Sequence, residues 1–298
     1  MANSMLKSLA AVQPGTSGII GHLTWMSISE LLISRDELRD KLKKNGLEGF
    51  MPAPIRLPDA FRRATNAKYR HILNSGLYEN YLFREVASDT KTVQRNIIRE
   101  TVDQKGRRLD YDGNAAVLIL DKQSEKVNIS ATCPVAERLA IDAATKFDIY
   151  KEHYGAQTVR SVLTAILKSM APTPVRPSGG VYFVPAKYQD QLSAMVAFAK
   201  SLERGEGQMV PMIDTSDMRS MVTQKLVDHL RQTLRACEES ADRQLTKSQL
   251  KELLENAKSV ANDFTQYREI VTGDLAEMES LVSAIRTKVS EALMNLAV

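Results

Sequence analysis

The chain has 298 residues, of which 43% are hydrophobic and 26% are charged, a composition that excludes disordered and collagen-like proteins. Its two cysteines, Cys133 and Cys237, are too few for a disulfide framework. No window approaches the ~20 uninterrupted apolar residues of a membrane span. We therefore expect a cytoplasmic protein of one to three domains that does not enter a membrane.

The net charge of +4 is unevenly distributed along the sequence. Residues 1–108 contain 18 basic and 11 acidic side chains, whereas residues 109–298 contain 22 and 25. A local excess of positive charge attracts phosphate or another acidic partner. The first third of the chain is therefore the candidate surface for such a partner, and a solvated basic face without a ligand is the alternative.

The first elements are expected to be a loop, a helix and a proline-rich connector. Residues 1–26 include glycines at positions 15, 18 and 21, a spacing that matches neither the dinucleotide fingerprint nor a phosphate-binding loop, and indicates a flexible lead-in. Ser27 or Ser29 is predicted to cap a helix that ends near Asn45. Three prolines between residues 52 and 58 predict an extended connector.

The middle of the chain is expected to begin with a short helix over residues 59–64 and to continue as an antiparallel meander. Runs rich in β-branched residues predict strands over residues 81–87, 92–102, 115–120 and 125–129, with turns between them. Helices are predicted over residues 133–154, 158–170 and 188–203, and short strands over residues 181–184 and 208–213.

From about residue 216 the sequence predicts long amphipathic helices. Val222, Leu226 and Leu230 follow one another at four-residue spacing, and similar apolar runs begin at Leu250 and Leu275. A boundary near residues 240–248 and a break at Gly273 favour a folded-back hairpin or bundle over one long coiled coil. The fold class predicted is thus α+β, with an antiparallel β-meander and flanking helices, followed by a helical C-terminal region. The expected division is residues 1–60, 61–214 and 215–298.

Basic side chains accumulate on the elements around the predicted meander, where Tyr69, Tyr78, Tyr81 and Phe83 are interleaved with them. A sheet with exposed aromatic rings and basic rims is one way of binding single-stranded nucleic acid, although the aromatic rings can equally belong to the core. The candidate nucleic-acid-binding residues are Arg62, Arg63, Lys68, Arg70, Arg84, Arg95, Arg99, Lys105, Arg107 and Arg108.

Three carboxylates, Asp110, Asp112 and Asp121, flank the apolar run of residues 115–120 and form the candidate metal site of an alternative function. Metal-dependent nucleases use such carboxylates, but Lys122 directly follows Asp121 and would point to the other face of a strand. Acidic hairpin turns are the simpler interpretation.

No catalytic or cofactor motif is present. The four histidines are far apart in sequence and lack metal-binding spacing. The sequence therefore predicts a non-enzymatic interaction protein without a cofactor. Its C-terminal helices would self-associate or bind a protein partner, and its basic face would bind nucleic acid. A metal-dependent enzyme that cleaves phosphodiesters is the alternative, and an adaptor with a merely solvated basic face is the third reading.

Overall fold

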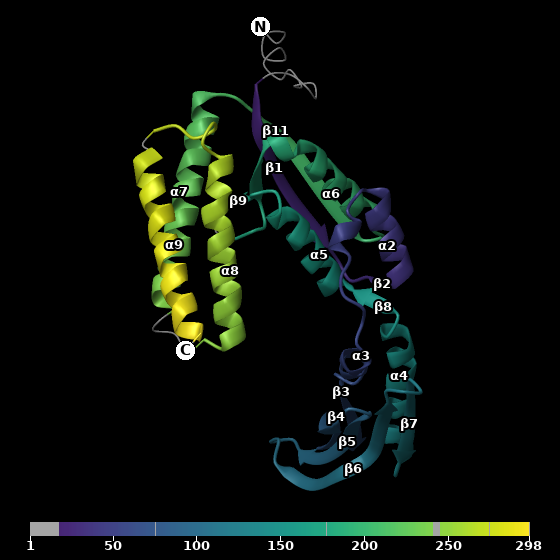
Figure 1. Ribbon diagram of the computed structural model, residues 1–298. Helices are drawn as coiled ribbons and strands as arrows, with labels where there is room; N and C mark the ends of the chain where they lie inside the picture. The colour runs from purple at the N-terminus through teal and green to yellow at the C-terminus, as the bar shows by residue number, and fades with distance from the viewer. Residues whose placement is uncertain (1–17, 75, 177, 241–244, 274, 298) are drawn as a thin grey trace. The chain divides into compact units, whose positions relative to one another are not determined.

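The computed structural model describes residues 18–74, 76–176, 178–240, 245–273 and 275–297 (Figure 1). Antiparallel sheets and helices are mixed along the chain, which confirms the α+β fold class. The chain divides into two compact units, each discontinuous in sequence. Residues 32–38 and 52–155 form one unit, and residues 39–51 with the described parts of 1–31 and 156–298 form the other. The predicted division at residues 60 and 214 stays a prediction.

The unit that contains the C-terminus is built on a four-stranded sheet with the strand order β11-β1-β10-β9. Helix α6 packs on this sheet through Val196 and Ala199, which approach Gly207 of β11. The elements of this part are β1 (Ile19–Ile28), η2 (Glu48–Phe50), α5 (Ala156–Lys168), β9 (Thr173–Pro174), β10 (Tyr182–Pro185), η3 (Ala186–Tyr188), α6 (Gln189–Ser201) and β11 (Gly205–Ile213).

The C-terminal region of the same unit is a bundle of three helices that lie side by side (Figure 1). Its elements are α7 (Ser216–Glu239), α8 (Lys247–Asp263), η4 (Phe264–Gln266) and α9 (Leu275–Ala297). The apolar stripes meet inside the bundle, where Leu230 and Ile285 are fully buried, and they share one hydrophobic cluster with Phe183 and Met212 of the sheet. The predicted folded-back bundle is confirmed. Residues 241–244, within the predicted boundary, lie outside the described residues.

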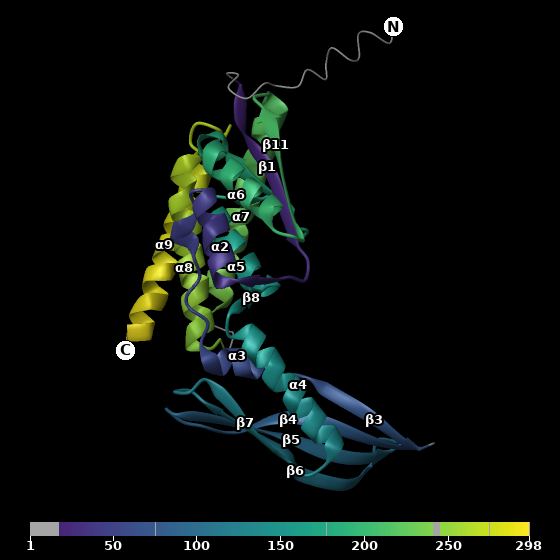
Figure 2. The ribbon, with the colours of Figure 1, turned by 90° about the vertical axis from the view of Figure 1, so that its right-hand side faces the viewer.

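The other unit is a curled five-stranded meander with the strand order β3-β4-β5-β6-β7 (Figure 2). Helices α3 and α4 lie on one of its faces and bury Phe61 and Phe147 against Ile97 and Leu118. A small second sheet pairs β2 with β8. The bounds are β2 (Leu32–Ser34), α3 (Leu57–Ala64), β3 (Lys68–Asn74), β4 (Leu77–Ser88), β5 (Thr92–Asp103), β6 (Arg108–Asp121), β7 (Lys126–Ala131), α4 (Pro134–Tyr150) and β8 (His153–Gly155).

The N-terminal part differs from its prediction. Residues 19–28 form strand β1 instead of a loop and a helix start, because hydrogen bonds to β10 and β11 on both sides stabilise the extended chain. Helix α2 (Arg35–Lys44) begins later than predicted, and the hydroxyl of Ser34, rather than Ser27 or Ser29, accepts the capping bond from the Glu37 N–H at 3.2 Å. The predicted loop over residues 1–17 lies outside the described residues.

Four further strands in the described part of the chain were not predicted. Strand β3 forms in a segment for which the sequence predicted no element, and the helix expected to reach residue 154 ends at Tyr150, so that residues 153–155 form β8. Strand β2 lies where a helix was expected, and the short strand β9 was not expected at all. No described helix is long and apolar enough to cross a membrane.

Candidate nucleic-acid interface

The five-stranded sheet has one face that none of the described helices covers, which we call the open face (Figure 2). Side chains alternate between the two faces of a strand, and directly paired residues share a face. Because Ile97 and Leu118 face α3 and α4, the residues next to them in sequence face the other way. The register therefore defines the rows of side chains on the open face.

Two of these rows contain an aromatic ring and an arginine. One row runs Ile72, Tyr78, Val102 and Arg108, and the next runs Arg70, Asn80, Glu100 and Tyr111. The guanidinium of Arg70 lies 5.3 Å from the centre of the Tyr78 ring, and that of Arg108 lies 5.4 Å from the Tyr111 ring. Tyr111 is 52% exposed, so one of the two rings presents a free aromatic surface to solvent.

Hydrogen bonds hold both arginines on the open face. Arg70 Nε donates to Asn80 Oδ1 at 2.9 Å, and Arg108 Nη2 lies 2.7 Å from Glu100 Oε1. The ion pair is partly exposed, so it contributes little to stability but orients the guanidinium over Tyr111. A hollow of about 350 Å³ in this region is lined by Lys68, Tyr69, Arg70, Asn80, Leu82 and Glu100.

Lys68 and Arg84 complete the positive charge of the open face. Lys68 pairs with Leu82 on β4, and Arg84 pairs with Asn96 on β5, which places both on the same side of the sheet as Arg70. Both side chains are exposed, and neither makes an ion pair within the described part of the chain. They are free to contact phosphate.

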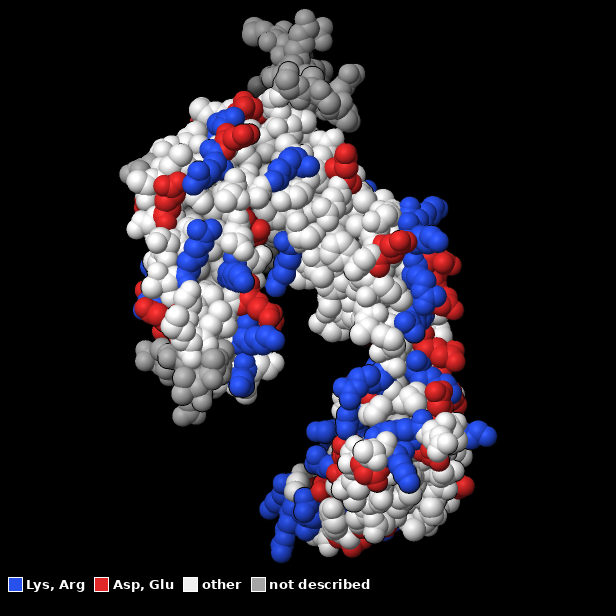
Figure 3. Space-filling view, viewed as in Figure 1, with Lys and Arg blue, Asp and Glu red and all other residues white. Residues whose placement is uncertain are grey.

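The hairpin between β5 and β6 contributes Lys105 and Arg107, whose side chains are also exposed. The carboxylate of Asp103 accepts hydrogen bonds from the backbone N–H groups of both residues, at 2.9 and 2.8 Å. This fixes the turn and leaves the two cationic side chains in solvent. Figure 3 shows Lys and Arg side chains gathered over this unit.

The other four candidate cations do not lie on the open face. Arg62 on α3 pairs with Glu85 at 2.8 Å, which raises the pKa of Arg62 and lowers that of Glu85. Arg63 on the same helix stacks on the Tyr150 ring at 3.9 Å. Arg99 lies between Glu79, Asp110 and Asp112 at 3.7 to 3.9 Å.

Arg95 has a structural environment. Its Nη1 donates to the Thr65 hydroxyl at 2.8 Å and to the Arg62 carbonyl at 3.2 Å, which fixes the end of α3 to the sheet. Burial lowers the pKa of Arg95. Arg95 and Arg99 share one face of β5, and that is the face on which α3 and α4 lie.

The aromatic residues divide in the same way. Tyr81 is buried in the core beneath α4, where burial and a hydrogen bond to Glu79 raise its pKa, and Phe83 packs against the same core. Tyr69 contacts Tyr81 on that side, with ring centres 6.4 Å apart. Only Tyr78 of the four predicted aromatic residues faces the open side. Tyr111 was missed, although its even spacing from Leu109 in a strand-like run is a usable signal.

The three aspartates are not brought together. Asp110 and Asp112 flank Arg99, whereas Asp121 lies at the other end of β6. Asp121 accepts hydrogen bonds from the N–H groups of Ser124 and Gln123, which lower its pKa and form the turn before β7. Within the described residues, no group of three or more His, Cys, Asp or Glu side chains could hold a metal ion.

Comparison with known proteins gives the family. A model of a family of unknown function, DUF6744, matches residues 19–298. The chain belongs to this family. The matched range includes residues of both compact units. No curated protein and no solved structure matches the chain.

Proposed function

We propose that the protein is a non-enzymatic interaction protein that binds single-stranded nucleic acid on the open face of its five-stranded sheet. The observation that supports this most directly is the pairing of aromatic rings with cations, Tyr78 with Arg70 and Tyr111 with Arg108. Bases stack on such rings whatever their sequence, and cationic side chains contact the phosphates between them.

The spacing of the groups suits a flexible strand. Tyr78 and Tyr111 lie in neighbouring rows and on different strands, so their rings offer two separate stacking positions. Lys68 and Arg84 lie further along the same face, where they would contact the backbone of the strand. A duplex, whose bases are already stacked, gains only the phosphate contacts. We therefore expect a preference for single strands.

The binding experiment uses the full chain and a fluorescently labelled oligo(dT) or oligo(U), with anisotropy as the readout. Replacing Tyr111 by alanine should weaken binding by about 1–3 kcal/mol, the usual contribution of one stacked base. The matched control is Tyr150→Ala on α4, an aromatic ring on the covered side of the sheet, which should leave affinity unchanged in folded protein. Undetectable binding of both polymers at low salt would overturn the proposal.

The salt dependence separates phosphate contacts from stacking. Each phosphate contact to a single strand contributes about 0.7 to the slope of log affinity against log salt. Lys68→Gln and Arg84→Gln should each lower this slope by about that amount, whereas Tyr111→Ala should leave it unchanged. The control is Lys146→Gln on α4, whose lysine pairs with Asp142 at 2.6 Å. An equal loss of slope in the control would assign the effect to net charge.

The C-terminal helices remain the proposed contact with a protein partner or with a second copy of the chain. Their apolar stripes are used within the bundle, so such a contact would employ the outer helix faces. Light scattering of the full chain over a range of concentrations tests self-association, and a monomer at every concentration would restrict the proposal to a different protein. Cleavage assays with added magnesium or manganese test the alternative phosphodiesterase function.

A further inference from the structure

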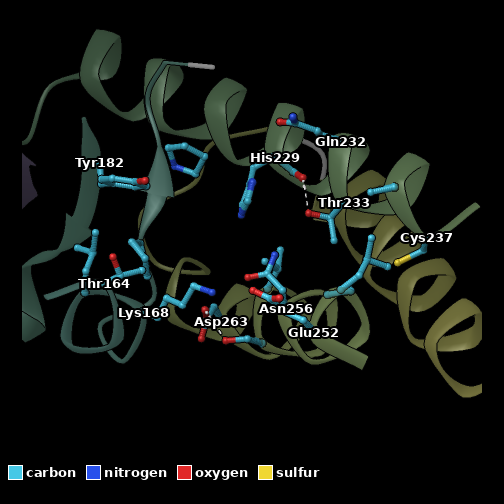
Figure 4. A pocket seen from close by; sticks show the side chains of 18 of the residues that line it. Thr164, Lys168, Tyr182, His229, Gln232, Thr233, Cys237, Glu252, Asn256 and Asp263 are labelled. Carbon is cyan, nitrogen blue, oxygen red and sulfur yellow. Dashed lines mark hydrogen bonds between the residues drawn. The ribbon is translucent and has the colours of Figure 1, made fainter. Parts of the chain in front are cut away.

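A second cavity lies in the unit that contains the C-terminus, between the bundle and the edge of the four-stranded sheet (Figure 4). Its volume is about 660 Å³, within the range of ~300–1,000 Å³ that is typical of small-ligand sites. Helices α7 and α8 form two of its walls, and α5 with Pro172, Pro174 and Tyr182 forms the third. It is independent of the open face, which belongs to the other unit.

Polar side chains from all three walls point into this cavity. His229 on α7 and Asn256 on α8 point toward one another across it, and Lys168 on α5 points in from the side (Figure 4). None of these three side chains makes a hydrogen bond or an ion pair within the described part of the chain. Lys168 and Asn256 are solvent-exposed and His229 is half-buried, so polar atoms of all three are accessible to a ligand that enters the cavity.

Both positively and negatively charged side chains line the cavity, and they come from different helices. Lys168 supplies a cation from α5, whereas Glu252 and Asp263 supply carboxylates from α8. Glu252, Asn256 and Asp263 recur at spacings of four and seven residues, so they follow one face of the helix. The two carboxylates are eleven residues apart, about 16 Å along the helix axis. Neither of them pairs with Lys168 in the structure.

The negative charge of the Asp263 carboxylate has few stabilising partners among the described residues. Among the residues that the structure describes, its one hydrogen bond comes from the Ser259 hydroxyl, at 3.5 Å. Burial raises its pKa to about 6, against the lowering effects of the Ser259 hydrogen bond and of the Lys187 charge. A ligand ammonium group would supply the missing charge. His229, whose pKa is lowered by burial, stays neutral at pH 7 and can donate or accept a hydrogen bond.

We propose that this cavity binds a small zwitterion, a ligand with an ammonium group and a carboxylate, such as a free amino acid or a short peptide. Lys168 contacts the ligand carboxylate, and the Asp263 carboxylate contacts its ammonium group. His229 and Asn256 bond the polar groups between the two ends. The presence of both charge signs in the lining favours a zwitterion, because the two carboxylates would repel a simple anion and Lys168 would repel a simple cation.

The test is calorimetric titration of the full chain with each of the twenty amino acids and with trialanine. Trialanine that is amidated at its C-terminus and trialanine that is acetylated at its N-terminus remove one charge each. Binding of an amino acid but not of trialanine identifies the free amino acid as the ligand, and the reverse identifies a peptide. For the probe that binds, removal of either charge should weaken binding at least tenfold.

Two variants connect the charges of the ligand to those of the cavity. Lys168→Met should weaken the zwitterion at least tenfold and bind the amidated probe as well as wild type does. Asp263→Asn should likewise weaken binding of the zwitterion at least tenfold, and it should bind the acetylated probe as well as wild type does. Lys200→Met on α6 and Glu255→Gln on α8 are exposed controls that should change nothing. Circular dichroism shows that each variant is folded.

Two results would overturn the proposal. One is the absence of binding by every probe at millimolar concentration. The other is equal affinity of wild type for the charged and the capped probes, because a site that recognises both charges must distinguish them. Neither result affects the proposal for the open face, since nucleic-acid binding is measured with a different ligand and with variants of the other unit.

Discussion

The hydroxyl of Thr173 donates a hydrogen bond to the hydroxyl of Tyr267 across 94 residues of sequence, at an oxygen–oxygen distance of 2.8 Å. The Tyr267 hydroxyl in turn donates to the Ala171 carbonyl at 2.6 Å, and its ring packs against Phe183 with centres 6.0 Å apart. Full burial raises the pKa of Tyr267. This residue therefore fastens the end of α8 and η4 to strands β9 and β10.

Replacing Tyr267 by phenylalanine should lower the free energy of unfolding by about 1–3 kcal/mol. The ring packing is kept, but the Ala171 carbonyl and the Thr173 hydroxyl lose their partner in a dry interior. Urea denaturation measures the change. Tyr69→Phe, at a partly exposed ring, is the control and should remain within about 0.5 kcal/mol of wild type. An unchanged free energy of unfolding in Tyr267→Phe would mean that the Ala171 carbonyl and the Thr173 hydroxyl form other hydrogen bonds in the variant.

Gly21 should not tolerate alanine. A methyl group there would collide with the Phe183 ring and the Val184 carbonyl, because β1 and β10 approach closely at this position. We expect a loss of about 1–3 kcal/mol, the usual result of overpacking a core. Gly49→Ala is the matched control, since nothing lies within 4 Å of the added atom there. Thermal unfolding compares the two, and equal midpoints would show that the strands can separate without loss.

Substitution of Arg95 should lower the stability of the fold and leave the affinity for nucleic acid unchanged. Arg95→Lys removes the pair of hydrogen bonds that one guanidinium nitrogen makes to Thr65 and Arg62. The expected loss is about 1–3 kcal/mol of unfolding free energy, with unchanged anisotropy titrations in folded protein. Weaker binding without a loss of stability would place Arg95 in the interface after all.

The titration of Asp263 should make the free energy of unfolding depend on pH between about pH 4 and pH 8. Its pKa of about 6 in the folded chain exceeds the ordinary value of 3.8. Its contribution to stability is therefore fully present below about pH 4 and is lost as the pH rises through 6. Asp263→Asn removes this dependence, so the variant should be about 1–2 kcal/mol more stable than wild type at pH 8 and nearly equal to it at pH 4. Denaturant midpoints across this pH range check the sign.

The elements with strong periodicity could be predicted because their pattern is local. The stripe of Val222, Leu226 and Leu230 forms the buried side of α7, and the turns at residues 103–106 and 121–124 occur between the strands where they were expected. The basic residues were found as a set, but not their division into an open face and a covered face. That division depends on which side of the sheet α3 and α4 occupy, and alternation alone gives two equivalent faces.

The sequence by itself determined the fold class, the C-terminal bundle and the part of the chain that carries the cations. The tertiary structure decided that residues 19–28 form the strand β1, because its hydrogen-bond partners lie more than 150 residues away in the chain. It also decided which rings became core and which stayed exposed, so that Tyr81 is buried and Tyr111 is not. The cavity lined by Lys168, His229 and Asp263 exists only in the folded chain, since its walls come from elements that are distant in sequence and meet through packing.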